Sequence, residues 1–432
     1  MQKAHVERRP LPRSLYADTA VPAPDTPVLS KDGTAQVVIV GGGYTGLSTA
    51  LHLAEAGADA VVLEAHEPGW GASGRNGGQV NPGLYPDPER IAEQFGRERA
   101  MAMLRFASGA PDRVFDLVRR HGIDCEAEQT GTLRVAFNAA GEAKIAATLG
   151  QYRSFGLPAE CVDSADLQRR TGTSRYRSGI FLSQGGKLNP LGYARGLAKA
   201  TIAAGARVHG GTPALRLQRT NAGWIVETPR TKLRADNVVL ATNGYTDGLW
   251  PGLRQSVVPV YTTIVASEPL PAEIAGRVMP AGSVLYEVGN NTVYYRLDRQ
   301  NRLLMGGRSV QRDVTGMADA RSLQAYALKL WPFLSGIGWT HVWNGQVAIT
   351  TDHQIHLHEL APGLTACLGY NGRGIAMATS MGGVIARRLL GASAEELPMP
   401  ITALQPIRFH ALWKPVTAVR LAYGAVLDRF SN

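Results

Sequence analysis

The sequence predicts an α/β protein in which a discontinuous domain with a largely parallel sheet is joined to a second, α+β domain built on a large mixed or antiparallel sheet. Two observations carry this prediction. Apolar runs typical of buried strands alternate with helical patterns in three separate stretches, near residues 36–65, 187–245 and 364–390. The stretch at 257–339 is instead rich in short alternating strands. With 432 residues, 44% of them apolar, the chain can bury more than one core.

The patterns also suggest where the domains begin and end. We expect an extended N-terminal arm at 1–33, a discontinuous ligand-binding domain at 34–86, 187–250 and 343–393, a second domain at 87–186 and 251–342, and a C-terminal extension at 394–432. Closely spaced prolines favour an extended arm. The extension combines apolar and basic residues and could touch a membrane surface, but a terminal helix packed on the body is the favoured interpretation.

The stretch Gln36–Ala65 has the features of a Rossmann-like dinucleotide-binding unit. A buried strand at Val37–Val40 stops at a glycine turn, a helix follows, and a second apolar strand ends at Glu64. Such a helix directs its positive N-terminal end at phosphate groups. Glu64 would accept hydrogen bonds from a ribose hydroxyl, which argues against a 2′-phosphate there. An ordinary α/β unit with a glycine-rich turn is the alternative.

The glycines of this turn have separate expected roles. Gly41 permits the tight turn, Gly43 lets a pyrophosphate approach the backbone, and Gly46 lets the helix pack on the sheet. Because the glycines occur together with both strands, the helix and the acid, the combination predicts a bound dinucleotide.

Two further glycine-dense segments are predicted to contact the same ligand. The first is the loop that follows the acid-bearing strand, whose core at 72–79 carries hydrogen-bond donors and one cation. A solvated surface loop is the alternative for this segment. The second is the turn at 369–374, which lies between a strand at 364–368 and a helix with small residues on its packing face. The N-terminus of that helix again favours negative charge.

One strand of the second domain carries a candidate for substrate binding. Alternation over 292–297 places Tyr294 and Arg296 on one face of the strand and Tyr295 on the other. A phenol and a guanidinium side by side could bind a substrate carboxylate. A polar strand face that simply meets solvent is an equally good interpretation.

Composition limits the classes of function. Lys and Arg number 45 and Asp and Glu number 35, a net charge of +10, but the basic residues are scattered, so no nucleic-acid partner is expected. A basic surface, or a funnel for anionic substrates, accounts for the charge. Three histidines lie between 353 and 358, but a zinc site needs further ligands at workable geometry, so no metal is expected.

The cysteines and the hydropathy of the sequence indicate the cellular compartment of the protein. Cys125, Cys161 and Cys367 are odd in number and far apart, which fits a reducing compartment. No apolar leader is visible, and no run approaches the ~18 apolar residues of a membrane span. A cytoplasmic protein without an integral membrane segment is therefore predicted.

Four motifs together resemble one known family. The GGGYTGLS turn, Glu64, the GWGASGRNGGQ loop and the GYNGRGIAMATSMGG segment are similar to those of the D-amino-acid-oxidase-like family of FAD-dependent amine oxidoreductases, near its gamma-glutamylputrescine oxidoreductase-like and glycine/sarcosine oxidase-like members. The resemblance spans residues 15 to about 390. It implies a discontinuous FAD-binding domain and a substrate domain whose large sheet covers the flavin.

The resemblance also implies roles for individual residues. The residues expected to contact FAD are Gly41, Gly43, Tyr44, Thr45 and Gly46 at the pyrophosphate; Glu64 at the adenosine ribose; Ser73, Gly74, Arg75, Asn76, Gly77, Gly78 and Gln79 along the pyrophosphate, ribityl chain and ring; Pro213 near the adenine; Thr242 and Asn243 over the cofactor; and Gly372, Arg373, Gly374 and Ile375 at the pyrimidine edge of the flavin.

The reaction implied is oxidation of a primary or secondary amine or an amino acid, gamma-glutamylputrescine-like or N-methyl amino acid-like. A hydride passes to flavin N5 and the imine hydrolyses, with oxygen or a quinone taking the electrons. Arg373 would stabilise negative charge at the flavin edge. Tyr44, Tyr294, Trp343 and Tyr370 are candidates for an aromatic wall around the amine, and two of the four are expected to face substrate.

Two departures from the family pattern matter. Relatives that attach FAD covalently use a cysteine shortly before the terminal segment, but residues 343–358 contain none, so non-covalent FAD is expected. Many relatives carry His where this chain has Arg373, which changes the charge at the flavin edge. The alternatives left open are an NAD-dependent dehydrogenase that uses the same turn, and a non-catalytic flavin-binding or structural protein.

Overall fold

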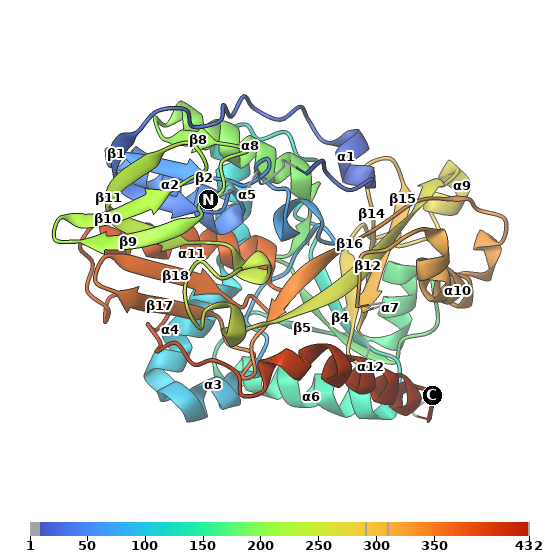
Figure 1. Cartoon of the computed structure of the whole chain (residues 1–432). Helices are drawn as coiled ribbons and strands as arrows, with labels where there is room; N and C mark the ends of the chain where they lie inside the picture. Colours follow the sequence, from blue (N-terminus) through green and yellow to red (C-terminus); the bar gives the residue numbers. More distant parts are fainter. Residues whose placement is uncertain (1–8, 290–291, 309–310, 431–432) are drawn as a thin grey trace.

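Two eight-stranded sheets dominate the structure, a computed structural model that describes residues 9–289, 292–308 and 311–430. Figure 1 shows the sheets side by side, the first with strands from an early, a middle and a late part of the chain and the second with strands from the segments between them. The predicted fold class, α/β with a discontinuous first unit and a second large mixed sheet, is confirmed.

The first sheet is mostly parallel, in the order β17-β18-β11-β1-β2-β8, with β10 and β9 added antiparallel beside β11. Its strands come from three separate stretches of the chain, at 33–63, 207–240 and 356–368. Parallel neighbours need crossover connections, and the intervening segments provide them. The strands are β1 (Gly33–Val40), β2 (Ala60–Leu63), β8 (Arg207–His209), β9 (Arg216–Thr220), β10 (Gly223–Glu227), β11 (Lys232–Leu240), β17 (His356–Ala361) and β18 (Leu364–Leu368).

Helices cover this sheet and share one core with it, which includes Ile39, Leu47 and Met381. The helices are α2 (Tyr44–Glu55), α3 (Pro88–Phe95), α4 (Arg97–Ser108), α5 (Ala110–Arg120), α8 (Pro190–Ala203) and α11 (Gly374–Leu389). Helices α2 and α11 pack so closely that a Cβ on Gly382 would lie 2.5 Å from that of Ser48. Residues 88–120 were expected in the second domain, but the apolar faces of α3–α5 are buried in the core of the first unit.

The second sheet has the order β16-β12-β15-β14-β13-β4-β6-β5 and is antiparallel except where β13 meets β4. Its strands are β4 (Thr132–Ala136), β5 (Glu160–Asp163), β6 (Ser178–Leu182), β12 (Val258–Pro269), β13 (Val284–Glu287), β14 (Val293–Leu297), β15 (Arg302–Arg308) and β16 (Trp339–Ile349). The helices of this part are α6 (Ala139–Ser154), α7 (Ser164–Thr171), α9 (Ala272–Ala275) and α10 (Arg321–Leu330).

One expected boundary falls inside this sheet. Residues 343–349 were assigned to the first domain, but all of β16 pairs with β12, with Trp343 opposite Ile264. A short antiparallel pair, β3 (Gln79–Val80) with β7 (Gly186–Lys187), lies apart from both sheets.

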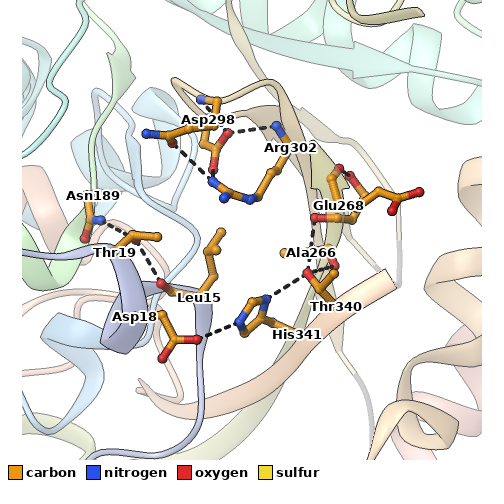
Figure 2. A network of polar contacts seen from close by, with 12 residues as sticks. Leu15, Asp18, Thr19, Asn189, Ala266, Glu268, Asp298, Arg302, Thr340 and His341 are labelled. Carbon is orange, nitrogen blue, oxygen red and sulfur yellow. Dashed lines mark hydrogen bonds and ion pairs between the residues drawn. The ribbon is translucent and has the colours of Figure 1, made fainter. Parts of the chain in front are cut away.

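The N-terminal arm is not fully extended, and it is held to the rest of the protein by specific contacts. It contains the short helix α1 (Leu15–Thr19), in which Leu15 and Tyr16 are buried. Figure 2 shows Asp18 of α1 beside His341 of β16, with 2.9 Å between carboxylate and imidazole, and Asn189 donating to the Thr19 hydroxyl at 3.2 Å. The arm therefore links the start of α8 to the second sheet.

The C-terminal tail forms the predicted helix, α12 (Trp413–Phe430), seen near the lower edge of Figure 1. Leu412, Val416 and Val419 are all more than half exposed. The expectation that the tail packs on the body is therefore wrong for these side chains. Within the described ranges, no helix combines the length and apolar character needed to cross a lipid bilayer.

Candidate functional site

A cavity of about 880 Å³ lies where the two sheets meet. Its floor is formed by the carboxyl ends of β1, β2 and β11, at Val40, Leu63 and Leu240, together with the N-termini of α2 and α11. Its roof is one face of the second sheet, which includes Thr262 and Tyr294. Ligands of open α/β sheets bind at this edge, and the volume is within the range of small-molecule sites.

The glycine turn before α2 brings bare backbone to the cavity. Gly41 has a φ of +111°, and a Cβ there would lie 2.9 Å from the carbonyl oxygen of Ala241. A Cβ on Gly46 would lie 2.0 Å from the carbonyl oxygen of Gly41, so only glycine lets the first turn of the helix fold back on the loop. The helix starts at once, with the amide of Leu47 donating to the Gly43 carbonyl at 2.9 Å. Its N-terminus is therefore directed at the cavity.

Glu64 lies directly after β2 and lines the cavity. Its carboxylate accepts the amide hydrogens of Gly42 at 2.7 Å and His66 at 2.9 Å. Burial raises the pKa of Glu64, and the backbone hydrogen bonds offset part of this effect. Pro213, Leu240 and further apolar side chains line the cavity as well. A carboxylate with a neighbouring apolar surface suits a sugar hydroxyl joined to a flat heterocycle.

The loop after Glu64 is held in one shape by its own polar groups. The amide of Tyr44 donates to the Ser73 hydroxyl at 3.0 Å, and Asn76 donates to the Ser73 carbonyl at 3.1 Å. Arg75 donates to the carbonyl of Trp70 at 2.7 Å and lies over its indole ring, 4.1 Å from the centroid. These contacts fix the loop against the α2 N-terminus, as preorganised binding requires.

The end of the loop is fixed to the second sheet. Gln79 donates to the carbonyls of Leu285 and Tyr295 at 3.0 and 3.1 Å. A Cβ on Gly77 would lie 2.5 Å from the ring of Tyr294, so the aromatic ring covers the bare loop backbone. The loop thus connects the floor of the cavity to its roof.

The segment before α11 closes the third side. Asn371, at a φ of +50°, accepts the amide hydrogen of Thr350 at 3.0 Å, which holds the turn to the strand end of β16. Tyr370 is hydrogen bonded to Thr45 with 2.6 Å between hydroxyl oxygens, joining the two helix N-termini. Arg373 donates to the Tyr286 hydroxyl at 2.9 Å. Two neighbouring segments near the start of the chain and one near its end therefore converge on one cavity.

Most of the candidate residues line this cavity. They are Gly41, Gly43, Tyr44, Thr45, Glu64, Ser73, Arg75, Asn76, Gly77, Gln79, Pro213, Thr242, Asn243, Tyr294, Tyr370, Gly372, Arg373, Gly374 and Ile375. Gly46, Gly74 and Gly78 do not line it but lie in the turns that shape it: a Cβ on Gly74 would meet the carbonyl oxygen of Gly69 at 2.3 Å.

Arg296 and Trp343 are not brought to the cavity. The buried guanidinium of Arg296 donates to the carbonyls of Gly77 and Leu188 at 2.8 and 3.1 Å and to the Tyr16 hydroxyl at 3.3 Å. Trp343 donates to the Arg75 carbonyl at 3.1 Å. Both side chains support the loop from behind. The expectation that Arg296 faces a substrate carboxylate, and Trp343 a substrate amine, disagrees with this geometry.

Sequence reasoning missed Tyr286 and Arg134, which line the cavity from neighbouring strands and are opposite each other in the β13–β4 register. Burial alone would raise the pKa of Tyr286, but the charges of Arg373 and Arg134 outweigh it and lower the pKa. The only feature of the sequence that pointed to Arg134 was its position as a single cation between two apolar residues, Leu133 and Val135, of the expected strand.

The histidine-rich stretch has other partners. His356 is 3.1 Å from the carboxylate of Asp352, and His358 is 2.7 Å from the carbonyl of Thr402. Among the residues that the structure describes, no cluster of three or more His, Cys, Asp or Glu could hold a metal ion.

Fold and cavity together define a dinucleotide-binding protein whose site is covered by a second sheet. Residues 36–388 match the family model for FAD dependent oxidoreductase. The chain is 32% identical over 387 residues to the probable oxidoreductase OrdL of Rhizobium meliloti, covering 88% of this chain and 89% of that protein. It is 31% identical over 428 residues to gamma-glutamylputrescine oxidoreductase of Escherichia coli, covering 96% and 98%.

Solved structures show the same fold. Glycine oxidase from Bacillus cereus superposes with a TM-score of 0.69 at 19% identity, over 85% of this chain and 99% of that one. The chain therefore belongs to the FAD-dependent oxidoreductase family, and the predicted family and enzyme class are confirmed.

The residues around the cavity fit FAD. Two helix N-termini line the cavity and favour phosphate groups there, and Glu64 offers acceptors beside an apolar surface. Between α2 and the loop, a Cβ on Gly43 would come 2.9 Å from the Ser73 hydroxyl, so any side chain at this position would enter the cradle.

Proposed function

We propose that this enzyme oxidises an amine or amino acid with non-covalently bound FAD. One observation carries the proposal: two neighbouring glycine-rich segments, at 41–46 and 73–79, and a third nearly 300 residues further on, at 369–374, line a single cavity roofed by the second sheet. The family supplies the cofactor class, and relatives with the printed names gamma-glutamylputrescine oxidoreductase and glycine oxidase support amines or amino acids as substrates.

Different residues of the cavity would contact different parts of FAD. Gly41, Gly43 and Thr45 would hold the pyrophosphate at the α2 N-terminus, and Glu64 would hold the adenosine ribose. Loop 73–79 would follow the ribityl chain, and residues 372–375 would meet the pyrimidine edge. When bound, the flavin supplies the acceptor for a hydride from the carbon next to the amine.

Positive charge at the flavin edge would come from the chain itself. Arg373 is held by its hydrogen bond to Tyr286, and α11 begins at the next residue, so a guanidinium and a helix N-terminus act at the same place. This preorganised charge would favour the reduced cofactor, which carries extra negative charge.

The aromatic side chains would position the amine and exclude water. Tyr294 and Tyr370 line the cavity, and burial raises the pKa of both phenols. They stay protonated at neutral pH and can orient the substrate but cannot accept its proton. The substrate amine would therefore react in its neutral form, with positioning as the main contribution of the protein.

Non-covalent binding is supported by the placement of sulfur. None of Cys125, Cys161 and Cys367 lines the cavity, and the Cys367 sulfur accepts a hydrogen bond from Tyr370 at 3.3 Å. Heat denaturation should therefore release yellow flavin into the supernatant. Flavin that remains attached to the precipitated chain would contradict this part of the proposal.

Anaerobic flavin bleaching tests the reaction. The holoenzyme is mixed with polyamines, gamma-glutamylated amines and N-methyl amino acids, and loss of visible flavin absorbance is expected with at least one class. Admitting air then separates oxygen from a quinone as the electron acceptor. A protein that keeps its flavin oxidised with every amine would be a non-catalytic flavin-binding protein, the alternative left open above. The cytoplasmic location stays a prediction.

A further inference from the structure

The large apolar side chains that the described chain exposes gather near its C-terminal end. Ten such side chains are exposed among the described residues, and five of them lie between 409 and 423. These five are 55–79% exposed, whereas the other five are 38–51% exposed. We call the first five the tail face: Phe409, Leu412, Val416, Val419 and Tyr423. Single exposed apolar residues are normal on a protein surface, but a group of them marks a site of interaction.

Helical spacing puts most of the tail face on one side of α12. Val416, Val419 and Tyr423 are three and four residues apart, the spacing at which side chains line one face of an α-helix. Leu412 precedes Val416 by four residues, at the end of the short 3-10 helix His410–Leu412 that leads into α12. The helix therefore presents an apolar stripe to the outside of the molecule.

The start of the tail is fixed to the body of the protein. The amide of Ile407 donates to the Gln255 carbonyl at 2.8 Å, and the His410 imidazole is 2.8 Å from the carbonyl oxygen of Val257. From there α12 follows the lower edge of the molecule in Figure 1. None of the described residues after 378 lines the cavity. The tail face is thus held at the surface, outside the proposed flavin site.

The charges that accompany the tail face have one sign. Residues 397–427 include no Asp or Glu and three Lys or Arg. Two of the three, Arg408 and Lys414, are exposed, and the Lys414 ammonium is 5.8 Å from the centroid of the Trp413 ring. Tryptophan and tyrosine are the aromatic residues that favour a membrane–water interface. An apolar stripe accompanied by cations and aromatic rings is complementary to an anionic lipid surface.

The same charges disfavour a second copy of the chain as the partner. A two-fold dimer through the tail face would place Arg408 and Lys414 of both copies in one interface, and residues 397–427 supply no acid to oppose them. Because no helix of the described chain is suited to span a bilayer, α12 would lie in the plane of a lipid surface.

We propose that α12 docks the enzyme on an anionic membrane surface. The tail face would enter the boundary between headgroups and acyl chains, and the cations beside it would contact lipid phosphates. This inference does not depend on the proposed amine oxidation, because it uses no residue of the cavity.

Cosedimentation of the holoenzyme with vesicles tests the proposal. Mixed vesicles of phosphatidylcholine and phosphatidylglycerol are compared with vesicles of phosphatidylcholine alone. Binding to the anionic vesicles should be about 10- to 100-fold tighter, as three basic residues near such a surface predict, and it should weaken at high salt.

Two double variants separate the apolar contribution from the charge. Val416→Gln with Val419→Gln should weaken binding to anionic vesicles at least about 10-fold, because the stripe loses apolar area. Arg408→Gln with Lys414→Gln should remove most of the preference for anionic over neutral vesicles. Leu328→Gln with Leu390→Gln changes two exposed leucines outside the tail and the cavity, so this matched control should bind as the wild type does.

Wild-type enzyme that stays in the supernatant with anionic vesicles, or that binds both kinds of vesicle equally, would refute the proposal. Unchanged binding of the Val416→Gln, Val419→Gln variant would refute it as well. A dimer that forms without lipid and that this variant loses would assign the tail face to a second copy instead. Urea midpoints check that every variant is folded. Flavin reduction should be the same in all of them, so the proposed reaction can fail without affecting the vesicle result.

Discussion

The same methyl group, added at two glycines of the α2 turn, is expected to have two different effects. At Gly46 a Cβ would lie 2.0 Å from the carbonyl oxygen of Gly41 and 3.1 Å from a methyl group of Ile39. The first contact is with backbone that is fixed between β1 and α2, so it cannot be relieved by a rotamer change. Overpacking in a core costs about 1–3 kcal/mol, and we expect Gly46→Ala to reach the upper end of that range.

At Gly43 the nearest atom to a Cβ is the Ser73 hydroxyl at 2.9 Å, the end of a side chain that can rotate. The fold should therefore tolerate Gly43→Ala. The methyl group would occupy the cradle expected to hold the pyrophosphate, so FAD affinity should fall about 10- to 100-fold, which corresponds to roughly 1.4–2.8 kcal/mol.

Two measurements separate the effects: the urea midpoint of the apoprotein, and FAD affinity on reconstitution. Gly150→Ala is the control, because its Cβ would meet nothing within 4 Å and it lies within α6, where alanine favours the helix by up to about 1 kcal/mol. Gly46→Ala with a wild-type midpoint, or Gly43→Ala with wild-type FAD affinity, would refute the assigned roles.

Three further changes probe other contacts. Arg296→Met should lower the free energy of unfolding by about 3 kcal/mol, since buried carbonyls of Gly77 and Leu188 lose their donor; denaturant unfolding measures this, and a wild-type midpoint would contradict a structural role of Arg296. Arg195→Met removes the donors to Val21 and Glu67, so limited proteolysis should cut the arm faster than in wild type. Burial raises the pKa of Asp352, but hydrogen bonds from His356 and the Gln354 amide outweigh it and lower the pKa to about 2. Its stabilising contribution is thus present above about pH 4 and lost as the pH falls toward 2. In Asp352→Asn, the free energy of unfolding measured with urea should fall less steeply between about pH 4 and 2 than in the wild type. An unchanged pH dependence would show that other groups determine it.

The parts of the site that could be predicted from sequence are those fixed by local chemistry. The strand, glycine turn, helix and acid at Gln36–Ala65 follow one another in a recognisable order. The contacts that require Gly46 lie within this unit, with Gly41 and Ile39, whereas those of Gly41 and Gly43 are with Ala241 and Ser73 outside it. The terminal turn before α11 was recognisable from its glycines and from the strand and helix patterns on either side of it. Domain boundaries were less accurate, since the apolar faces of α3–α5 do not reveal which of two cores they enter.

Strand alternation alone cannot show that Arg134 lines the cavity and that Arg296 does not. Alternation correctly put Tyr294 and Arg296 on one face of β14, and that face does meet the glycine loop. The position along the strand separates the two side chains: Tyr294 reaches the cavity, while Arg296 lies behind the loop and donates to two backbone carbonyls and to the hydroxyl of the arm residue Tyr16. The arm is more than 250 residues away in sequence, so no local pattern could reveal that Arg296 already has its partners. Arg134 is the single cation of β4 and lines the cavity, with the carboxylate of Asp87 at 3.9 Å. Whether a cation of the sequence is free for a ligand therefore depends on partners that only the fold brings to it.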